Sequence, residues 1–149
     1  MESDAFLSRQ EVVCPSFLLR RAAGKGPVVT AIVGAEHPVV LDSARQAQMA
    51  GIITPVLIGN QSKIKDEAQG VGWDVSGVEI VEASGEASAA QAGAELASSG
   101  VVAMVMKGHV HSDTFMRPLL AKEGGIRGLG RLSHVFHMTI PDSEKSIML

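Results

Sequence analysis

Hydroxyl and basic side chains gather in one short stretch of the chain. Ser112, Thr114 and Arg117 lie close together, and Lys107 precedes them at the end of an apolar run. Hydroxyl groups donate hydrogen bonds to phosphate oxygens, and an arginine guanidinium can hold a phosphate through two parallel hydrogen bonds. We therefore predict a phosphate-binding site formed by Ser112, Thr114 and Arg117, with Lys107 and Arg131 assisting.

The same residues also have an ordinary structural interpretation. Ser112 or Thr114 could cap a helix, and Arg117 could form an ion pair with Asp113 one helical turn away. Lys107 could be the solvent-exposed end of a strand. The spacing alone leaves both interpretations open, and it assigns no catalytic residue.

Two histidines lie in the same stretch. His109 and His111 alternate, so they share one face of an extended segment. With His134 or His137 they could ligate a metal, but no acidic residue or cysteine stands at a firm ligand spacing from them. We therefore expect no metal site and interpret these histidines as hydrogen-bonding residues of a loop.

The charge distribution favours a small anionic ligand. The chain has 149 residues and a net charge of −3, whereas residues 107–131 carry five basic and two acidic side chains. With no Tyr, one Trp and four Phe, the chain offers few rings on which nucleic-acid bases could stack. A positive region on an acidic body suits a small anion better than a long polymer, so we expect no nucleic-acid partner.

The number of cysteines and the lack of a long apolar run indicate the cellular compartment. A single cysteine, Cys14, excludes an internal disulfide framework and fits a reducing compartment. No apolar run is long enough to cross a membrane, and the first residues do not resemble a secretory signal. We therefore expect a cytoplasmic protein without a membrane partner.

The elements that position these residues alternate between strand and helix. We expect strands at 28–33, 55–58, 78–81 and 101–106, and helices at 38–50, 61–69, 85–99 and 114–122, with Pro118 in the first turn of the last helix. Strands that are apolar throughout and alternate with helices predict a three-layer α/β fold with a mostly parallel sheet. An N-terminal helical segment, 1–27, precedes this domain, 28–149.

The end of the chain has its own pattern. Residues 132–140 and 146–149 read as strands of a C-terminal β-hairpin, joined by a turn at 141–143. The final apolar run has no polar tail, which leads us to expect a truncated domain. An unpaired apolar edge is usually covered by another chain, so we also expect a homo-oligomer.

The chain resembles the phosphate acetyl/butyryltransferase family, nearest to the phosphate butyryltransferase-like branch. The resemblance runs from about Val28 to the end. Its most specific segments are Ala103-Met104-Val105-Met106-Lys107-Gly108, Thr114-Phe115-Met116-Arg117, Lys122-Glu123-Gly124-Gly125-Ile126-Arg127 and Arg131-Leu132-Ser133-His134-Val135.

The resemblance implies transfer of an acyl group between coenzyme A, as co-substrate, and inorganic phosphate. Family members are about twice as long, with an active site between two domains, and their second half carries residues credited with thiol activation. This chain resembles the first half, so it is expected to contribute phosphate contacts with little turnover alone. The alternative from a different class is a non-catalytic domain that binds phosphate or acyl phosphate for regulation.

Overall fold

The structure, a computed structural model, describes residues 14–128, 132–139 and 146–149. The chain divides into two compact units. The larger unit is Gly24–Ser133, and the smaller one combines Met1–Ala23 with His134–Leu149. None of the described helices is long and apolar enough to cross a bilayer.

The larger unit is built on a parallel sheet. Its strands are β1 (Val28–Val33), β2 (Ile53–Gly59), β3 (Glu79–Glu82) and β4 (Met104–Lys107), in the order β3-β2-β1-β4. Every neighbouring pair is parallel. Residues 30–33 of β1 are fully buried, as expected for a strand covered on both faces.

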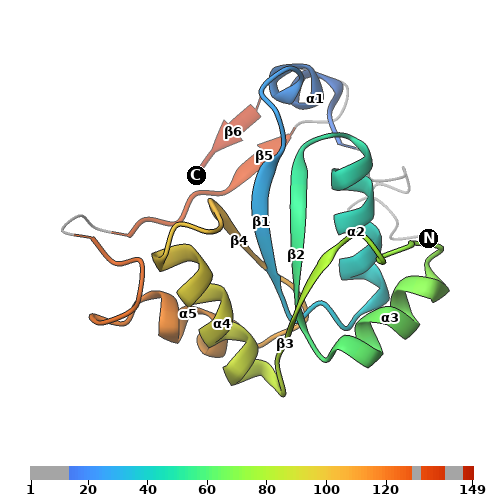
Figure 1. Ribbon diagram of the computed structural model, residues 1–149. Coiled ribbons are helices and arrows are strands. Elements are labelled where there is room, and N and C mark those ends of the chain that lie inside the picture. Colours follow the sequence, from blue (N-terminus) through green and yellow to red (C-terminus); the bar gives the residue numbers. More distant parts are fainter. Residues whose placement is uncertain (1–13, 129–131, 140–145) are drawn as a thin grey trace, which may run out of the picture. The chain divides into compact units, whose positions relative to one another are not determined.

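Helices cover both faces of this sheet, which confirms the predicted α/β fold with a mostly parallel sheet (Figure 1). On one face, α2 (Pro38–Met49) and α3 (Gln61–Gly70) pack around Ile32, Leu41, Leu57 and Ile64. On the other face, α4 (Glu86–Ser98) and α5 (Ser112–Leu119) pack around Val33, Ile58, Ala90 and Phe115.

Helix α4 packs on the sheet through small residues. The buried side of α4 consists of Ala89, Ala90, Gly93 and Ala94. A Cβ atom added to Gly93 would lie 2.6 Å from Cγ2 of Val33 on β1. Small residues on this side therefore set the distance between α4 and the sheet.

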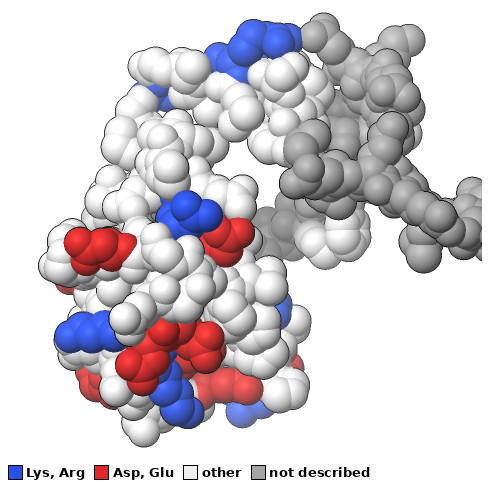
Figure 2. All heavy atoms as spheres, turned by 90° about the vertical axis from the view of Figure 1, so that its right-hand side faces the viewer, with Lys and Arg blue, Asp and Glu red and all other residues white. Residues whose placement is uncertain are grey.

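The outer face formed by α2 and α3 is mixed in charge. Acidic and basic side chains are mixed in the view from this side (Figure 2). The two helices carry both signs, with Asp42 and Arg45 on α2 and Lys65 and Asp66 on α3. On α2 the Arg45 guanidinium lies 2.6 Å from the Asp42 carboxylate. This face therefore lacks the single-sign charge that steers a polyanion.

The smaller unit contains α1 (Ser16–Ala22) and the antiparallel strands β5 (His137–Thr139) and β6 (Ser146–Met148). Phe136 and Leu149 extend the pairing by exchanging backbone hydrogen bonds of 2.8 and 3.0 Å. The antiparallel pairing of the predicted C-terminal hairpin is thus confirmed, although its first strand, expected from residue 132, begins at His137. Its predicted turn at 141–143 lies outside the described residues.

The fourth strand and the last helix of the larger unit begin at other residues than expected. The strand expected at 101–106 begins only at Met104, because the N–H groups of Val101 and Val102 both donate to the Leu96 carbonyl at the end of α4. The helix expected at 114–122 begins at Ser112 and ends at Leu119. Pro118 therefore lies in its last turn, and the prediction that it lies in the first turn was wrong.

Candidate anion-binding site

The loops that follow β1 and β4 meet at one edge of the sheet. The N–H of Gly108 donates to the Val33 carbonyl at 2.8 Å, and that of His109 donates to the Gly34 carbonyl at 2.9 Å. The rings of His37 and His109 stack with centroids 4.6 Å apart. The strand order reverses between β1 and β4, and open α/β sheets bind ligands at the carboxyl ends of the strands at such a point.

Helix α5 starts at this edge without a side-chain cap. His111 is its N-cap residue, in an extended conformation, and makes no capping hydrogen bond through its side chain. The capping role open to Ser112 or Thr114 is therefore not what the structure shows, because both lie inside the first turn. N–H groups in the first turn of a helix that no side chain of the N-cap residue accepts are favourable for an anion.

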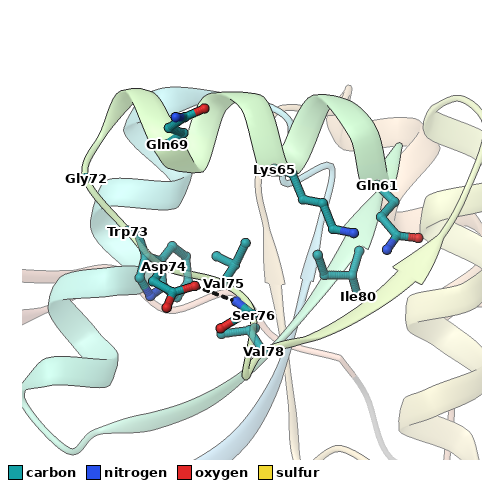
Figure 3. Close-up of a pocket in the computed structure, with 10 residues that line it drawn as sticks. All are labelled: Gln61, Lys65, Gln69, Gly72, Trp73, Asp74, Val75, Ser76, Val78 and Ile80. Atoms are coloured by element: carbon teal, nitrogen blue, oxygen red, sulfur yellow. Dashed lines mark hydrogen bonds between the residues drawn. The ribbon is translucent and has the colours of Figure 1, made fainter.

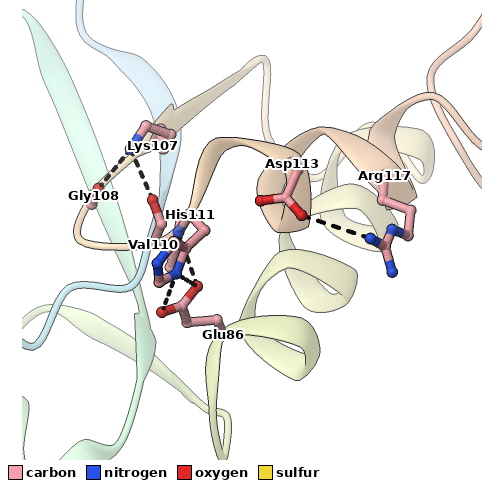
Figure 4. Close-up of polar contacts among 7 residues, drawn as sticks. All are labelled: Glu86, Lys107, Gly108, Val110, His111, Asp113 and Arg117. Atoms are coloured by element: carbon pink, nitrogen blue, oxygen red, sulfur yellow. Dashed lines mark hydrogen bonds and ion pairs between the residues drawn. The ribbon is translucent and has the colours of Figure 1, made fainter.

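Glu86 holds the residue at the start of α5. It lies in the first turn of α4, and its Oε2 accepts a hydrogen bond of 2.8 Å from the backbone N–H of His111. The same carboxylate lies 2.8 and 2.9 Å from Nδ1 of the His111 ring (Figure 4). These contacts join the start of α4 to the start of α5.

The two groups shift each other's pKa. The backbone hydrogen bond from His111, followed by the bond from its ring, lowers the pKa of Glu86. The hydrogen bond to Glu86, followed by the carboxylate's charge, raises the pKa of His111 above its ordinary value of 6.5. The carboxylate and the imidazolium therefore stabilise each other in their charged forms.

The predicted basic residues lie on either side of this contact. The Lys107 ammonium donates to the Val110 carbonyl at 2.8 Å and so braces the loop before α5. Arg117 lies in the last turn of α5, and its guanidinium is 3.6 Å from the Asp113 carboxylate. Figure 4 shows Lys107 and Arg117 at opposite ends of this segment, so the structure does not bring them together.

Arg117 is nevertheless available to a ligand. Its side chain is 80% exposed, and that of Asp113 is 73% exposed. The predicted surface ion pair between Arg117 and Asp113 is therefore present, and its exposure allows Arg117 to leave Asp113 for a ligand. Thr114 and Arg117 are three residues apart on α5, which places them on one face of the helix. Arg131 lies outside the described residues.

A small pocket adjoins the start of α5. Its volume is about 200 Å³, and it is lined by Glu86, Lys107, Gly108, His109, Val110 and His111. Among the described residues, no group of three or more His, Cys, Asp or Glu is placed to hold a metal ion. Of the two loop histidines, His111 makes the expected hydrogen bond, whereas His109 stacks on His37.

The start of α3 lies at the same edge but is already filled. Asn60 Oδ1 accepts the N–H of Lys63 at 3.0 Å. The Glu36 carboxylate accepts the N–H of Asn60 at 2.6 Å, and the Glu82 carboxylate accepts that of Gln61 at 2.8 Å. At α5 a carboxylate, that of Glu86, accepts only the N–H of the N-cap residue His111, so the start of α3 offers an external anion fewer N–H groups than the start of α5.

Two further cavities contain no predicted site residue. One, of about 710 Å³, lies between α3 and β3, where Lys65 and Gln61 point from the helix toward Ile80 (Figure 3). The other, of about 380 Å³, is mainly apolar and is lined by Met116 and Leu119 of α5 together with residues after that helix, among them Arg127.

Sequence reasoning missed Glu86 and His37. Glu86 lies 25 residues before His111, in an alanine-rich segment with no pattern that points to the loop. Its one local signal, an acid at the start of a helix, is common in proteins. His37 directly precedes the helix expected at 38–50, but its stacking partner could not be found without the strand order.

The fold is that of a doubly wound α/β domain, and the candidate anion site lies at its topological switch point. The family model described as phosphate acetyl/butaryl transferase matches residues 18–92, which is half of the chain, and the chain belongs to this family. The predicted site residues follow the matched segment, so the match itself gives them no role.

Curated relatives agree with this assignment. Phosphate acetyltransferase of Rickettsia prowazekii is 36% identical over 136 residues, covering 89% of this chain and 38% of the relative. Phosphate butyryltransferase of Clostridium acetobutylicum is 36% identical over 118 residues, covering 79% of this chain and 39% of the relative. The chain thus spans about two-fifths of the length of these relatives.

Solved structures share the fold. The EutD phosphotransacetylase from Staphylococcus aureus aligns with a TM-score of 0.68 at 22% identity, covering 89% of this chain and 49% of that one. A phosphotransacetylase from Streptococcus pyogenes aligns with a TM-score of 0.69 at 16% identity over the same shares of the two chains.

Proposed function

We propose that this chain forms the phosphate-binding part of an acyltransferase that moves an acetyl- or butyryl-type group between coenzyme A and inorganic phosphate. The observation that carries the proposal is the uncapped start of α5 at the switch point of the sheet, with Thr114 and Arg117 on one helix face. Membership of the family supports it, and so do relatives named for both acyl groups.

In this proposal the residues of α5 hold the phosphate. Backbone N–H groups at the helix start and the hydroxyls of Ser112 and Thr114 donate to its oxygens, while Arg117 exchanges Asp113 for the ligand. In the direction that consumes acyl phosphate, the coenzyme A thiolate attacks the carbonyl carbon and phosphate leaves. Cations fixed near the leaving phosphate lower the barrier by neutralising its charge.

Lys107 and Arg131 assist in this scheme. Lys107 adds positive charge at the loop while its ammonium braces Val110. Arg131 is assigned from the sequence. In this proposal coenzyme A is the co-substrate. The enzyme assembles as a homo-oligomer. The single cysteine, Cys14, is exposed and unpaired, which suits a reducing compartment such as the cytoplasm.

The alternative is a non-catalytic domain that binds phosphate or acyl phosphate for regulation. It is favoured by one observation, that the chain covers only 38% of the acetyltransferase relative. Both candidates require anion binding, and only the first requires acyl transfer once the rest of such an enzyme is supplied. Titration of phosphate therefore tests the shared basis of both.

Replacing Arg117 tests the site. Arg117→Ala should weaken phosphate binding about 10- to 150-fold, because a charge-assisted hydrogen bond contributes about 1.5–3 kcal/mol. Arg117→Lys should restore only part of the affinity, because lysine lacks the planar fork. Calorimetric titration of inorganic phosphate measures both changes, with the melting temperature as the folding control.

Arg45→Ala is the matched control. Arg45 also pairs with an acid on its own helix, at 2.6 Å from Asp42, but lies on α2. We expect this variant to bind phosphate like the wild type, with a similarly small change in melting temperature. Equal phosphate affinities of wild type and Arg117→Ala would remove Arg117 from the site and refute the proposed function.

A further inference from the structure

Of the two ring nitrogens of His111, Nδ1 contacts a carboxylate and Nε2 can still donate a hydrogen bond to a ligand. Nδ1 lies against the Glu86 carboxylate, which also accepts the backbone N–H of the same residue. These two contacts fix both the position of His111 and the orientation of its ring. The side chain remains 80% exposed, and His111 is one of the residues that line the pocket beside the start of α5.

Charged groups on three elements act on this ring. Glu86 on α4 and Asp113 on α5 favour its protonated form, and Lys107 at the end of β4 opposes it. His109, the other titratable group of the loop, stacks on His37. The Glu86 hydrogen bond is the largest influence and raises the pKa of His111, so the imidazolium persists to a higher pH than that of a free histidine.

We propose that His111 is a further anion-binding residue, which donates its Nε2–H as an imidazolium to a phosphate oxygen, and that Glu86 is its positioning residue. The inference rests on the proposed phosphate site and adds a titrating cation to it. An imidazolium with one N–H bound to a carboxylate keeps the other N–H for a ligand. Its ligand class is a tetrahedral oxyanion, either free phosphate or the phosphate of an acyl phosphate.

The simpler possibility is that Glu86 only ties α4 to α5. In that case its carboxylate serves the backbone N–H of His111, and the ring contributes nothing to the ligand. The two possibilities differ in how anion affinity depends on pH. Only a ligand-binding imidazolium makes the affinity fall as pH rises through the pKa of His111.

Sulfate is the best probe because its charge is constant over the range in which histidine titrates, between about pH 5 and 8. Calorimetric titrations at constant ionic strength should show sulfate affinity decreasing about tenfold or more as pH rises in the wild type. His111→Gln should abolish most of this decrease. Glu86→Gln should move its midpoint to lower pH, because the ring loses the carboxylate that stabilises its charge.

An NMR titration and a control variant test whether the pH dependence arises from His111. Ring-proton NMR reports the midpoint of His111 directly, and added sulfate should raise it in the wild type. His137→Gln, which removes a histidine of the smaller unit, should leave the pH profile of sulfate binding unchanged. His111→Gln keeps the backbone N–H group that donates a hydrogen bond to Glu86. We therefore expect this variant to fold and to test the inference even if Glu86→Gln does not fold.

The outcomes separate the inference from the proposed function. If sulfate and phosphate bind, Arg117→Ala weakens them, and His111→Gln keeps the wild-type pH profile, the inference is overturned and the proposed site stands. An unchanged midpoint in folded Glu86→Gln removes the positioning role. If neither anion binds to the wild type, both proposals fail.

Discussion

Gly34 and Gly108 determine how closely the loops after β1 and β4 approach each other. Gly34 has a φ of 71°, in the left-handed region that favours glycine. A Cβ atom on Gly108 would lie 2.5 Å from the Gly34 carbonyl oxygen and 2.7 Å from that of Val33. Both oxygens accept hydrogen bonds from the other loop, so they cannot retreat without breaking the contact.

Gly108→Ala should therefore destabilise the protein. We expect a loss of about 1–3 kcal/mol in the free energy of unfolding, typical of overpacking against atoms that cannot move. Anion binding should weaken as well, because the loop leads into α5. Urea denaturation measures the first effect and phosphate titration the second.

Gly70→Ala is the matched control for this substitution. Gly70 is the last residue of α3, and a Cβ atom there would meet no atom within 4 Å. The same chemical change should leave stability unchanged or slightly improved, because alanine favours helix. Equal losses in the two variants would show that the close approach at Gly108 does not limit stability.

The candidate site was only partly predictable at the level of residues. Ser112, Thr114 and Arg117 could be selected because their types suit an anion and their spacing suits a helix start. Glu86 could not, because a contact over 25 residues depends on how α4 and α5 pack. The ring stacking of His37 on His109 depends likewise on β1 and β4 being neighbours.

Among the elements, strands and helices with clear ends were predicted best. The strand at Val28–Val33 was predicted with its correct bounds, because a continuous run of residues that favour strands ends there at Gly34. The start of β4 was missed because two apolar residues of the run, Val101 and Val102, bond back to α4. Apolar character alone cannot distinguish such a helix exit from a strand.

The packing of α4 on β1 gives a prediction about an element. Gly93→Ala improves helix propensity by about 1 kcal/mol, whereas overpacking costs about 1–3 kcal/mol. The added Cβ would meet Cγ2 of the fully buried Val33 at 2.6 Å. We therefore expect net destabilisation in urea denaturation.

A second variant tests the assigned cause. Val33→Ala removes the methyl group that Gly93→Ala would strike, at its own cost in stability. In that background Gly93→Ala should become neutral or stabilising, so the two substitutions are strongly non-additive. Additive effects would mean that the contact with Val33 does not set the position of α4.

For the whole molecule, exposed apolar side chains predict self-association. The end of the chain exposes Ile147, Met148 and Leu149 by 44, 62 and 70%. Such surfaces are usually covered by another chain. Analytical ultracentrifugation should therefore show an oligomer, and Met148→Lys should weaken it.

Met49→Lys is the control for that experiment. Met49 is 75% exposed on α2, away from the chain end in sequence, and its replacement should leave association unchanged. A wild-type protein that sediments as a monomer at high concentration would contradict the prediction.

Turnover gives the second prediction for the whole molecule. Because the chain spans 38% of the acetyltransferase relative, we expect it to bind phosphate but to form little or no acyl phosphate from acetyl- or butyryl-coenzyme A. An assay of acyl-phosphate formation tests this expectation. Rapid turnover by the chain alone would show that these residues suffice for the reaction.

The filled start of α3 has a consequence for selectivity. Two helix starts, those of α3 and α5, lie at the same edge and present similar groups to an anion. Glu36 and Glu82 are tethered beside the first and act as resident competitors, with an effective concentration that a dilute free anion cannot match. At α5 the resident carboxylate of Glu86 accepts only the N–H of the N-cap residue His111. In the proposed site the first turn of α5 is therefore the helix start that remains for an incoming anion.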